Sequence, residues 1–445
     1  MSSHHSITLD DLPPGGERLD LAKVSKLTST FLVLGIAGLA VSLYYMFGGM
    51  GEQKQAEFAY SWLFAFFFFF TITNGGVFWV LLHNLTNSGW SVAIKRLYEN
   101  LAGNVKWMAI FAAPLILFTP FKKALWEWYV IHDTAAKMAD GDVLKGLEEG
   151  AKANPEWHIL IEKFSYLNNT WWLIRAFLYF AFLIGLVYLI RRWSNQQDKD
   201  GSFKHTFRIR ALCAFPLALY ALTVTFSGVD WVMSMDFTWY STMWGVYIFA
   251  GGAWSSMALF IIVLTYLRGH GYFKQTVSME HYHLMGQLLF AFTVFWAYIG
   301  FDQFFLIWYA NITEETRFFH LRNCEGWWYV SNVLVWGHFV ATFVILLSAW
   351  RKKNPVSMSW VGAWVLLMHC VDIYWLIIPE RGPSLTKGGE LWIPGAWVGD
   401  VAAFVGIGGI VAWAFFRRLA TVSLIPIRDP RLVESINASN VVPCS

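Results

Sequence analysis

The feature that most constrains this chain is a series of about ten apolar stretches, most of them close to the ~20 residues that a helix needs to cross a ~30 Å hydrocarbon layer. Backbone N–H and C=O groups left unpaired in lipid cost several kcal/mol each, so each stretch is expected to form a helix. The sequence therefore predicts an all-α polytopic membrane protein. The predicted spans are 27–45, 58–82, 106–119, 170–190, 209–227, 240–267, 284–310, 328–350, 359–378 and 397–416.

Composition agrees with this class of protein. Hydrophobic residues make up 56% of the chain and charged residues only 14%, well below the ~25% of a soluble domain. The formal net charge is +3, so nothing points to nucleic acid as a partner. The third span, 106–119, is the weakest prediction because it is short and contains Pro114.

The distribution of basic residues predicts the orientation. With the N-terminus in the cytoplasm, cytoplasmic segments hold about twenty-one lysines and arginines, against about eleven outside. An even number of spans then places both termini in the cytoplasm. The predicted organisation is a cytoplasmic N-terminal tail (1–26), a ten-helix transmembrane domain (27–418) with an outer loop (121–169), and a cytoplasmic C-terminal tail (419–445).

The connecting segments give further expectations. Apolar residues recur at roughly helical spacing in loop 121–169, which predicts one or two amphipathic helices on the outer surface or against a partner. The tail after the last span has too few apolar residues for a domain and is expected to run as an extended strap. Spans two to five and six to nine could form two four-helix bundles, with the first and last helices peripheral.

The cysteines argue against several redox centres. Cys213, Cys324, Cys370 and Cys444 are scattered, and no CxxC or CxxCH occurs. This pattern disfavours a covalent c-type haem, an iron–sulfur site and a disulfide framework. Redox chemistry would need a diffusible carrier or a partner subunit.

Ionisable residues at membrane depth are the strongest functional signal, because a charge at the centre of a membrane helix costs at least about 2.5 to 3.5 kcal/mol. His338 and His369 fall near the midplane, each about 15 Å from a helix end at 1.5 Å per residue. Asp372, Asp302 and Arg175 follow nearer the outside. Four carboxylates are expected at the outer ends, and we interpret them as a possible exit: Asp230, Asp236, Glu380 and Asp400.

In order of depth, these groups outline a proton half-channel that opens toward one surface. On the cytoplasmic side His83 and His283, with Glu280 and His281, could supply an entry, although solvated residues are ordinary at helix ends. Structural alternatives stay open. His369 and Asp372 could form a hydrogen-bonded pair that ties helices together, and Arg175 with Asp302 could be a buried ion pair between the bundles.

Three strings carry a resemblance to a known family. They are FSGVDWVMSMDFTWYSTMWGVYIFAGG (226–252), FFLIWYANITEET (304–316) and PIRDPRLVES (426–435). They resemble alternative complex III of bacterial respiratory chains, and within it the second membrane subunit of the polysulfide-reductase-anchor (NrfD-like) type. The resemblance runs over nearly the whole chain.

The resemblance implies a function in the bacterial inner (plasma) membrane. Such complexes oxidise menaquinol or ubiquinol and pass electrons, through partner subunits that hold iron–sulfur clusters and haem c, to cytochrome c or a terminal oxidase. The implied partners are a sister NrfD-like subunit, an iron–sulfur subunit, c-type cytochrome subunits and an oxidase. The subunit resembled here binds no cofactor of its own and is proposed to conduct protons and to act as a scaffold.

Other functions stay open at this point. The chain could itself be the quinol-binding subunit. Ten helices with charges near the midplane could also form a secondary transporter, although no matching pair of interrupted helices is visible in the two halves. A b-type cytochrome is a further alternative, because His338 and His369 lie at equal depth on consecutive spans and could ligate one haem.

Overall fold

A computed structural model describes residues 8, 11–13, 16–324, 326–385, 393 and 395–438. Within them the chain is all-α, as predicted, and contains 10 helices that are long and apolar enough to cross a membrane. Much of the predicted N-terminal tail and Cys444 lie outside the described residues.

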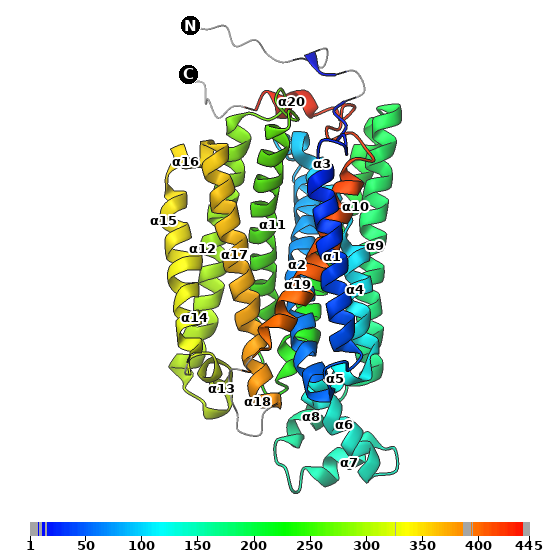
Figure 1. Ribbon diagram of the computed structural model, residues 1–445, viewed down its shortest axis with the longest axis vertical. Helices are drawn as coiled ribbons and strands as arrows, with labels where there is room; N and C mark the ends of the chain where they lie inside the picture. Colours follow the sequence, from blue (N-terminus) through cyan, green and yellow to red (C-terminus); the bar gives the residue numbers. More distant parts are fainter. Residues whose placement is uncertain are drawn as a thin grey trace.

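The membrane-crossing helices run roughly parallel to one long axis (Figure 1). Their bounds are α1 Ser25–Met46, α2 Glu52–Leu85, α4 Val105–Leu117, α9 Asn169–Asp200, α10 Phe203–Trp231, α11 Trp244–Gly269, α12 Met279–Ala310, the composite α14 Trp327–Val333, η4 Leu334–Ala341 and α15 Thr342–Leu347, α17 Pro355–Ile377, and α19 Trp397–Leu419. Shorter helices connect them: η2 Val92–Ile94, α3 Lys95–Ala102, α5 Thr119–Leu125, α6 Glu127–Met138, α7 Val143–Gly150, α8 Trp157–Lys163, η3 Met233–Met235, α13 Thr313–Leu321, α16 Ala349–Lys353, η5 Ile378–Glu380, α18 Arg381–Leu385 and α20 Leu432–Ile436.

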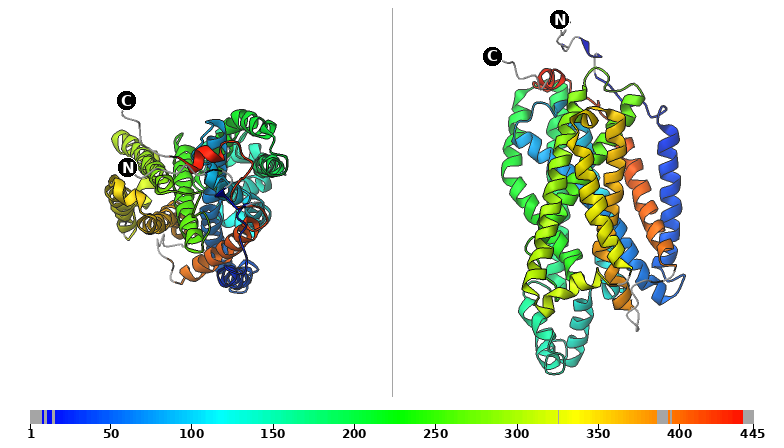
Figure 2. Two further views of the ribbon diagram at one scale, coloured as in Figure 1. Left: turned by 90° about the horizontal axis from the view of Figure 1, so that it is seen from above. Right: turned by 90° about the vertical axis from the view of Figure 1, so that its left-hand side faces the viewer.

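The crossing helices form two groups. The first bundle consists of α2, α4, α9 and α10, and the second bundle of α11, α12, α14–η4–α15 and α17. Helices α1 and α19 pack on each other outside both bundles, as the view from above shows (Figure 2). This is the arrangement that the order of the spans predicted. We call the end that carries α5–α8 the loop end, and the opposite end, where α1 begins and α19 ends, the terminal end.

The two bundles meet through α2 and α11, which approach each other closely. Gly75 on α2 faces Gly252 on α11, and a Cβ atom at Gly75 would lie 2.1 Å from the carbonyl oxygen of Gly252. A larger residue at either position would push the helices apart. Small residues therefore fix the distance between the bundles, as they commonly do between membrane helices.

The weakly predicted third span is a composite of short helices, in which η2, α3 and α4 together cover Val92–Leu117. Helix α4 has 13 residues and so spans only about 20 Å. Pro114 lies inside it, and the carbonyl of Pro114 accepts a hydrogen bond from Phe118 N where the helix ends. Helices α3 and α5 continue the chain at its two ends and both pack against α2, so the remaining depth is filled by separate short helices.

The outer loop is more helical than predicted. Instead of one or two helices it contains α6, α7 and α8, with α5 leading into them, and these form a cap at the loop end (Figure 1). The ring centroids of Trp126 and Trp128 lie 4.8 Å and 6.3 Å from that of Trp172 on α9. The cap is therefore anchored to the first bundle through buried indole rings.

The C-terminal segment runs as a strap over the terminal end and finishes in α20. Asp429 pairs with Lys95 at 2.9 Å, and the hydroxyl of Ser435 donates to the carbonyl of Trp90. Burial raises the pKa of Asp429, but the cations Lys95 and Arg431 more than offset this and lower it to about 2. The carboxylate is therefore ionised at neutral pH and holds the strap in place.

Candidate functional site

The second bundle contains a local departure from α-helical geometry. Residues Leu334–Ala341 form a π-helical turn, η4, between α14 and α15. The carbonyl of Gly337 in this turn accepts hydrogen bonds from the Thr342 hydroxyl at 3.1 Å and from the indole of Trp364 at 3.1 Å. Single π turns inside membrane helices frequently occur at functional sites. This one contains His338.

His338 is clamped between two indole rings. The centroid of its ring lies 4.0 Å from that of Trp254 on α11 and 3.5 Å from that of Trp296 on α12, with nearly parallel planes. The residue is fully buried, and neither ring nitrogen has a hydrogen-bond partner among the described residues. A buried polar group without a partner is costly, so its presence requires an explanation.

Asp372 on α17 lies in the same cluster. The hydroxyl of Tyr247 donates a hydrogen bond to its Oδ1 atom, and the indole N–H of Trp296 donates to Oδ2 at 3.2 Å. Trp296 therefore touches both groups, stacking on His338 and donating to Asp372. No cation bonds this carboxylate within the described residues.

His369 is one turn away from Asp372 but does not bond to it. Its Nε2 atom lies 2.9 Å from the hydroxyl of Thr71 on α2, and its Nδ1 has no hydrogen-bond partner among the described side chains and backbone. The structural alternative, a hydrogen bond between His369 and Asp372, is therefore not formed, because each residue bonds to a different neighbouring helix. We call Thr71, Tyr247, Trp296, His338, His369 and Asp372 the polar cluster.

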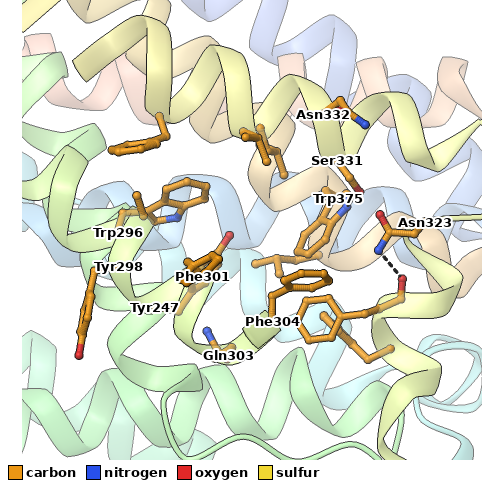
Figure 3. A pocket seen from close by; sticks show the side chains of 18 of the residues that line it. Tyr247, Trp296, Tyr298, Phe301, Gln303, Phe304, Asn323, Ser331, Asn332 and Trp375 are labelled. Atoms are coloured by element: carbon orange, nitrogen blue, oxygen red, sulfur yellow. Dashed lines mark hydrogen bonds between the residues drawn. The ribbon is translucent and has the colours of Figure 1, made fainter. Parts of the chain in front are cut away.

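A cavity of about 650 Å³ adjoins this cluster on the side of the loop end. It lies between α11, α12, α13, α14, η4 and α17, and its walls are mainly aromatic (Figure 3). Tyr298, Phe301 and Val335 line it and are exposed, so the cavity opens toward the surrounding lipid. Tyr247 and Trp296 also line it, so the two donors to Asp372 connect the cavity with the polar cluster.

Arg175 forms an ion pair, but with a different partner from the one considered as a structural alternative. Its guanidinium donates to both oxygens of Asp230 at 2.8 Å, and the hydroxyl of Tyr179 also donates to that carboxylate at 2.7 Å. Arg175 does not pair with Asp302, which is partly exposed on α12 of the other bundle. A two-residue turn joins α9 to α10, so the start of α9 lies beside the end of α10, and this register places Arg175 opposite Asp230.

The remaining outer carboxylates are also held by arginines. Glu380 lies 3.0 Å from Arg322 and Asp400 lies 2.8 Å from Arg381, and all four side chains are buried. Asp236 faces Arg317 at 3.7 Å. These carboxylates were interpreted as a possible exit at the outer ends. The structure has them in ion pairs that sequence analysis missed, because the arginines lie in connecting segments.

The inner residues lie at the terminal end. His83 is buried and packs among Trp79, Trp90 and Tyr98, beneath the strap. The ring of Trp90 also lies 6.4 Å from that of His281, so His83 and His281 contact the same indole. His283 bonds to Glu280 at 2.9 Å on its own helix.

Sequence reasoning missed the aromatic members of the polar cluster. Neither Tyr247 nor Trp296 was singled out from the sequence, nor was Trp254, whose ring stacks on His338 of the cluster. A signal was present, because Trp254 and Trp296 occur well inside their spans, whereas tryptophan is usually enriched at the membrane interfaces. A deep tryptophan that can donate a hydrogen bond indicates a buried acceptor.

Among the described residues, no group of three or more His, Cys, Asp and Glu side chains is arranged to hold a metal ion. Comparison with known protein families finds no family model that matches the chain, and comparison with curated proteins finds no match either. The polar cluster and its cavity therefore carry the functional argument, together with the resemblance noted above.

Proposed function

We propose that this chain is an integral membrane subunit of a bacterial respiratory quinol-oxidising complex of the alternative complex III type, in which it contributes a proton path and a scaffold. The resemblance of three sequence strings supports the choice of complex. The polar cluster supports the role in proton transfer. The loop end faces the periplasm in this proposal, and both termini lie in the cytoplasm, as the basic residues indicate.

The single observation that carries the proposal is the contact of Trp296 with both His338 and Asp372. An aspartate and a histidine, both buried inside membrane-crossing helices, are held by aromatic donors and ring stacking, and no described residue forms an ion pair with either. Intramembrane carboxylates and histidines of this kind are typical of proton relays.

The chemistry follows from the reaction. Oxidation of a quinol releases two protons and two electrons, and the protons need acceptors along their way out. Histidine is the natural acceptor near neutral pH, and a buried carboxylate can serve as the next site. In this proposal the ring nitrogens of His338 and the oxygens of Asp372 hold protons in turn, and Tyr247 orients the carboxylate. Electrons travel through haem c and iron–sulfur clusters in partner subunits.

The test is to replace each of the two protonatable groups separately in the assembled complex. The complex is purified from native membranes in mild detergent, and quinol turnover and protons released per electron are measured for His338→Phe and Asp372→Leu. Positioned acid–base groups contribute about 100-fold or more to rates, so we expect turnover to fall by roughly 100-fold in each variant. Unchanged turnover together with unchanged proton stoichiometry would reject the proposal.

Asp133→Asn is the matched control, because Asp133 is an exposed carboxylate of the loop-end cap that pairs only with Lys123 and Lys137. Its removal should leave turnover and stoichiometry unchanged. Identification of the co-purified subunits in the same preparation tests the choice of complex. A preparation without haem-containing or iron–sulfur partners would contradict it.

One observation favours a second candidate, in which this chain binds the quinol itself. The cavity is lined by aromatic side chains, opens toward lipid and ends at Tyr247 and Trp296. Ala297→Phe would narrow it, so the KM for quinol should rise if quinol enters there and should stay constant if the chain only conducts protons. Leu306→Phe, at an exposed position of α12 outside the cavity lining, is the control.

A b-type cytochrome and a secondary transporter have less support. Nε2 of His369 bonds to Thr71, and both faces of His338 are covered by indole rings, so the two imidazoles do not flank an open space for a haem. A visible spectrum of the purified chain would decide this point. Solute uptake by the isolated chain would favour a transporter.

A further inference from the structure

A second site lies far from the polar cluster, at the terminal end of the first bundle. Three basic side chains come from three different helices there. Lys106 is in the first turn of α4, Arg191 is near the end of α9, and Arg418 is in the last turn of α19. Helix α4 packs against α9, and α3, which leads into α4, packs against both α9 and α19. We call these three residues the basic cluster.

The members of the basic cluster repel one another. The ammonium group of Lys106 is within electrostatic range of the guanidinium groups of Arg191 and Arg418, and those two guanidinium groups also interact. None of the three forms an ion pair in the part of the chain that the structure describes. Three neighbouring positive charges create a local positive potential that attracts an anion from outside the chain.

The nearby carboxylates are already engaged. Glu99 accepts hydrogen bonds from Arg96 at 2.8 Å and from the Ser194 hydroxyl at 2.7 Å. Asp198 also pairs with Arg96. Among the described residues Arg191 donates to neutral acceptors, the side-chain oxygen of Asn100 at 2.8 Å and the backbone carbonyl of Glu99 at 3.0 Å. Its charge also interacts with the carboxylate of Glu99, which Arg96 and Lys95 already neutralise.

The backbone makes room for this arrangement. Arg418 lies directly over Gly103, where a Cβ atom would come within 1.9 Å of its Nη1 atom. Its hydrogen bond to the carbonyl of Asn100 is long, at 3.4 Å, so the guanidinium retains donors for another acceptor. Glycine at position 103 therefore allows the side chain to fold back toward Lys106 and Arg191.

The surroundings of the basic cluster are those of a membrane interface. Trp107 and Trp413 lie beside it with ring centroids 6.4 Å apart, and tryptophan is enriched at the level of lipid headgroups. Below Lys106, Ile110 and Leu117 follow at i+4 and i+11, which is the same face of α4, and their exposed fractions are 56% and 71%. A charged head above an exposed apolar stripe matches the shape of one phospholipid.

We propose that the basic cluster binds the phosphate of an anionic phospholipid headgroup, with an acyl chain lying along Ile110 and Leu117. Basic pockets between membrane helices commonly bind such headgroups, and each lysine or arginine near the surface contributes to the attraction. The guanidinium groups of Arg191 and Arg418 offer the hydrogen-bond geometry that phosphate oxygens accept. This site is independent of the function proposed above.

The test uses the full chain, purified in mild detergent with the subunits that accompany it and then delipidated. Binding of phosphatidylglycerol, phosphatidylcholine and inorganic phosphate is measured by native mass spectrometry and by the shift of the thermal unfolding midpoint. We expect phosphatidylglycerol alone to bind and stabilise. Equal binding of phosphatidylcholine would overturn the proposal, and binding of inorganic phosphate as tight as that of phosphatidylglycerol would assign the site to free phosphate instead.

Variants locate the binding. Lys106→Gln and Arg418→Gln should each weaken phosphatidylglycerol binding by roughly fivefold, the effect of one surface charge. Lys106 is exposed, so its variant keeps the test decisive if Arg418→Gln does not fold. Arg351→Gln, an exposed arginine at the same end of the second bundle, is the control and should bind normally. Unchanged affinity in both cluster variants would place the lipid elsewhere.

Discussion

The first bundle closes around aromatic rings, whereas the second encloses a histidine and an aspartate among its aromatic rings. In the first, the ring of Trp231 packs against those of Phe66, Phe70 and Phe180 with centroids 5.1 to 5.7 Å apart. In the second, the indole rings of Trp254 and Trp296 stack on the two sides of His338. The indole N–H of Trp296 also donates to Asp372. Both bundles are built from long apolar helices, so helix length and hydropathy do not distinguish them.

The bundles also treat charge differently. In the first, the buried carboxylate of Asp230 is held by the guanidinium of Arg175 through two hydrogen bonds. In the second, the donors to Asp372 in the part of the chain that the structure describes are neutral. An arginine partner compensates the charge of a buried carboxylate, whereas neutral donors do not. The comparison supports a structural role for the first pair and agrees with the proton transfer proposed at the second.

The largest expected effect follows from breaking the pair in the first bundle. Arg175→Ala leaves Asp230 buried with the Tyr179 hydroxyl but without its counter-charge, which should lower the free energy of unfolding by about 3 kcal/mol. Thermal unfolding of the purified protein measures this loss. Turnover per folded molecule should stay unchanged, because the pair lies outside the polar cluster.

Lys137→Ala is the control for the stability loss expected in Arg175→Ala. Lys137 pairs with Asp133 on the exposed surface of α6, and exposed pairs contribute at most about 1 kcal/mol. If Arg175→Ala left stability intact and reduced turnover instead, the distinction between a structural and a functional bundle would fail.

A smaller loss of stability is expected to distinguish two buried tryptophans, Trp296 and Trp231. Trp296→Phe and Trp231→Phe both shorten an aromatic side chain in a packed bundle, but only Trp296 donates a hydrogen bond, since the indole nitrogen of Trp231 has no partner among the described residues. Trp296→Phe leaves Oδ2 of Asp372 without its donor, so it should lower the unfolding free energy by about 1–2 kcal/mol more than Trp231→Phe.

Turnover gives the second readout for this pair of variants. Trp296→Phe should also reduce quinol turnover, because the carboxylate loses the donor that orients it beside His338. Trp231→Phe should not. Equal losses of turnover in the two variants would mean that general packing, and not the hydrogen bond, explains the effect.

The sequence predicted the helices well because hydropathy depends on residue type and length alone. It placed His338, His369 and Asp372 inside their spans, and all three lie within membrane-crossing helices and are buried. It failed on partners, because depth along a helix gives no information on the direction in which a side chain points. Asp302 and Asp230 are both plausible partners for Arg175 by depth, and only the register of α9 against α10 selects Asp230.

The π turn and the loop-end cap could not be predicted for a different reason. A π turn depends on the hydrogen bonds that neighbouring side chains offer to freed carbonyls, and Trp364, which bonds to Gly337, lies on the next membrane-crossing helix. The cap depends on the contact between Trp126 and Trp172, which are distant in sequence. Long-range contacts of this kind leave no periodic pattern in the chain.

The smallest expected effect concerns the histidine that belongs to the first bundle's cap. His132 on α6 packs against the rings of Trp128 and Phe164, each with centroids 5.6 Å away, and burial lowers its pKa to about 4. In the unfolded cap its pKa returns to about 6.5. The folded cap therefore holds a neutral imidazole, and the unfolded cap binds a proton as the pH falls below 6.5. Stability of the cap is complete above pH 6.5 and is lost toward pH 4.

Between pH 7.5 and pH 6 the loss should be roughly 0.8 kcal/mol, or about a fourfold drop in hydrogen-exchange protection of α6 after correction for the intrinsic rate. His132→Phe should remove this pH dependence. Glu127, whose pKa is raised by burial, shifts stability in the opposite direction, but it is present in both proteins, so the difference between them isolates His132. If His132→Phe instead altered quinol turnover and left the exchange of α6 unchanged, a titratable group of the first bundle would take part in function, and the contrast with His338 would no longer hold.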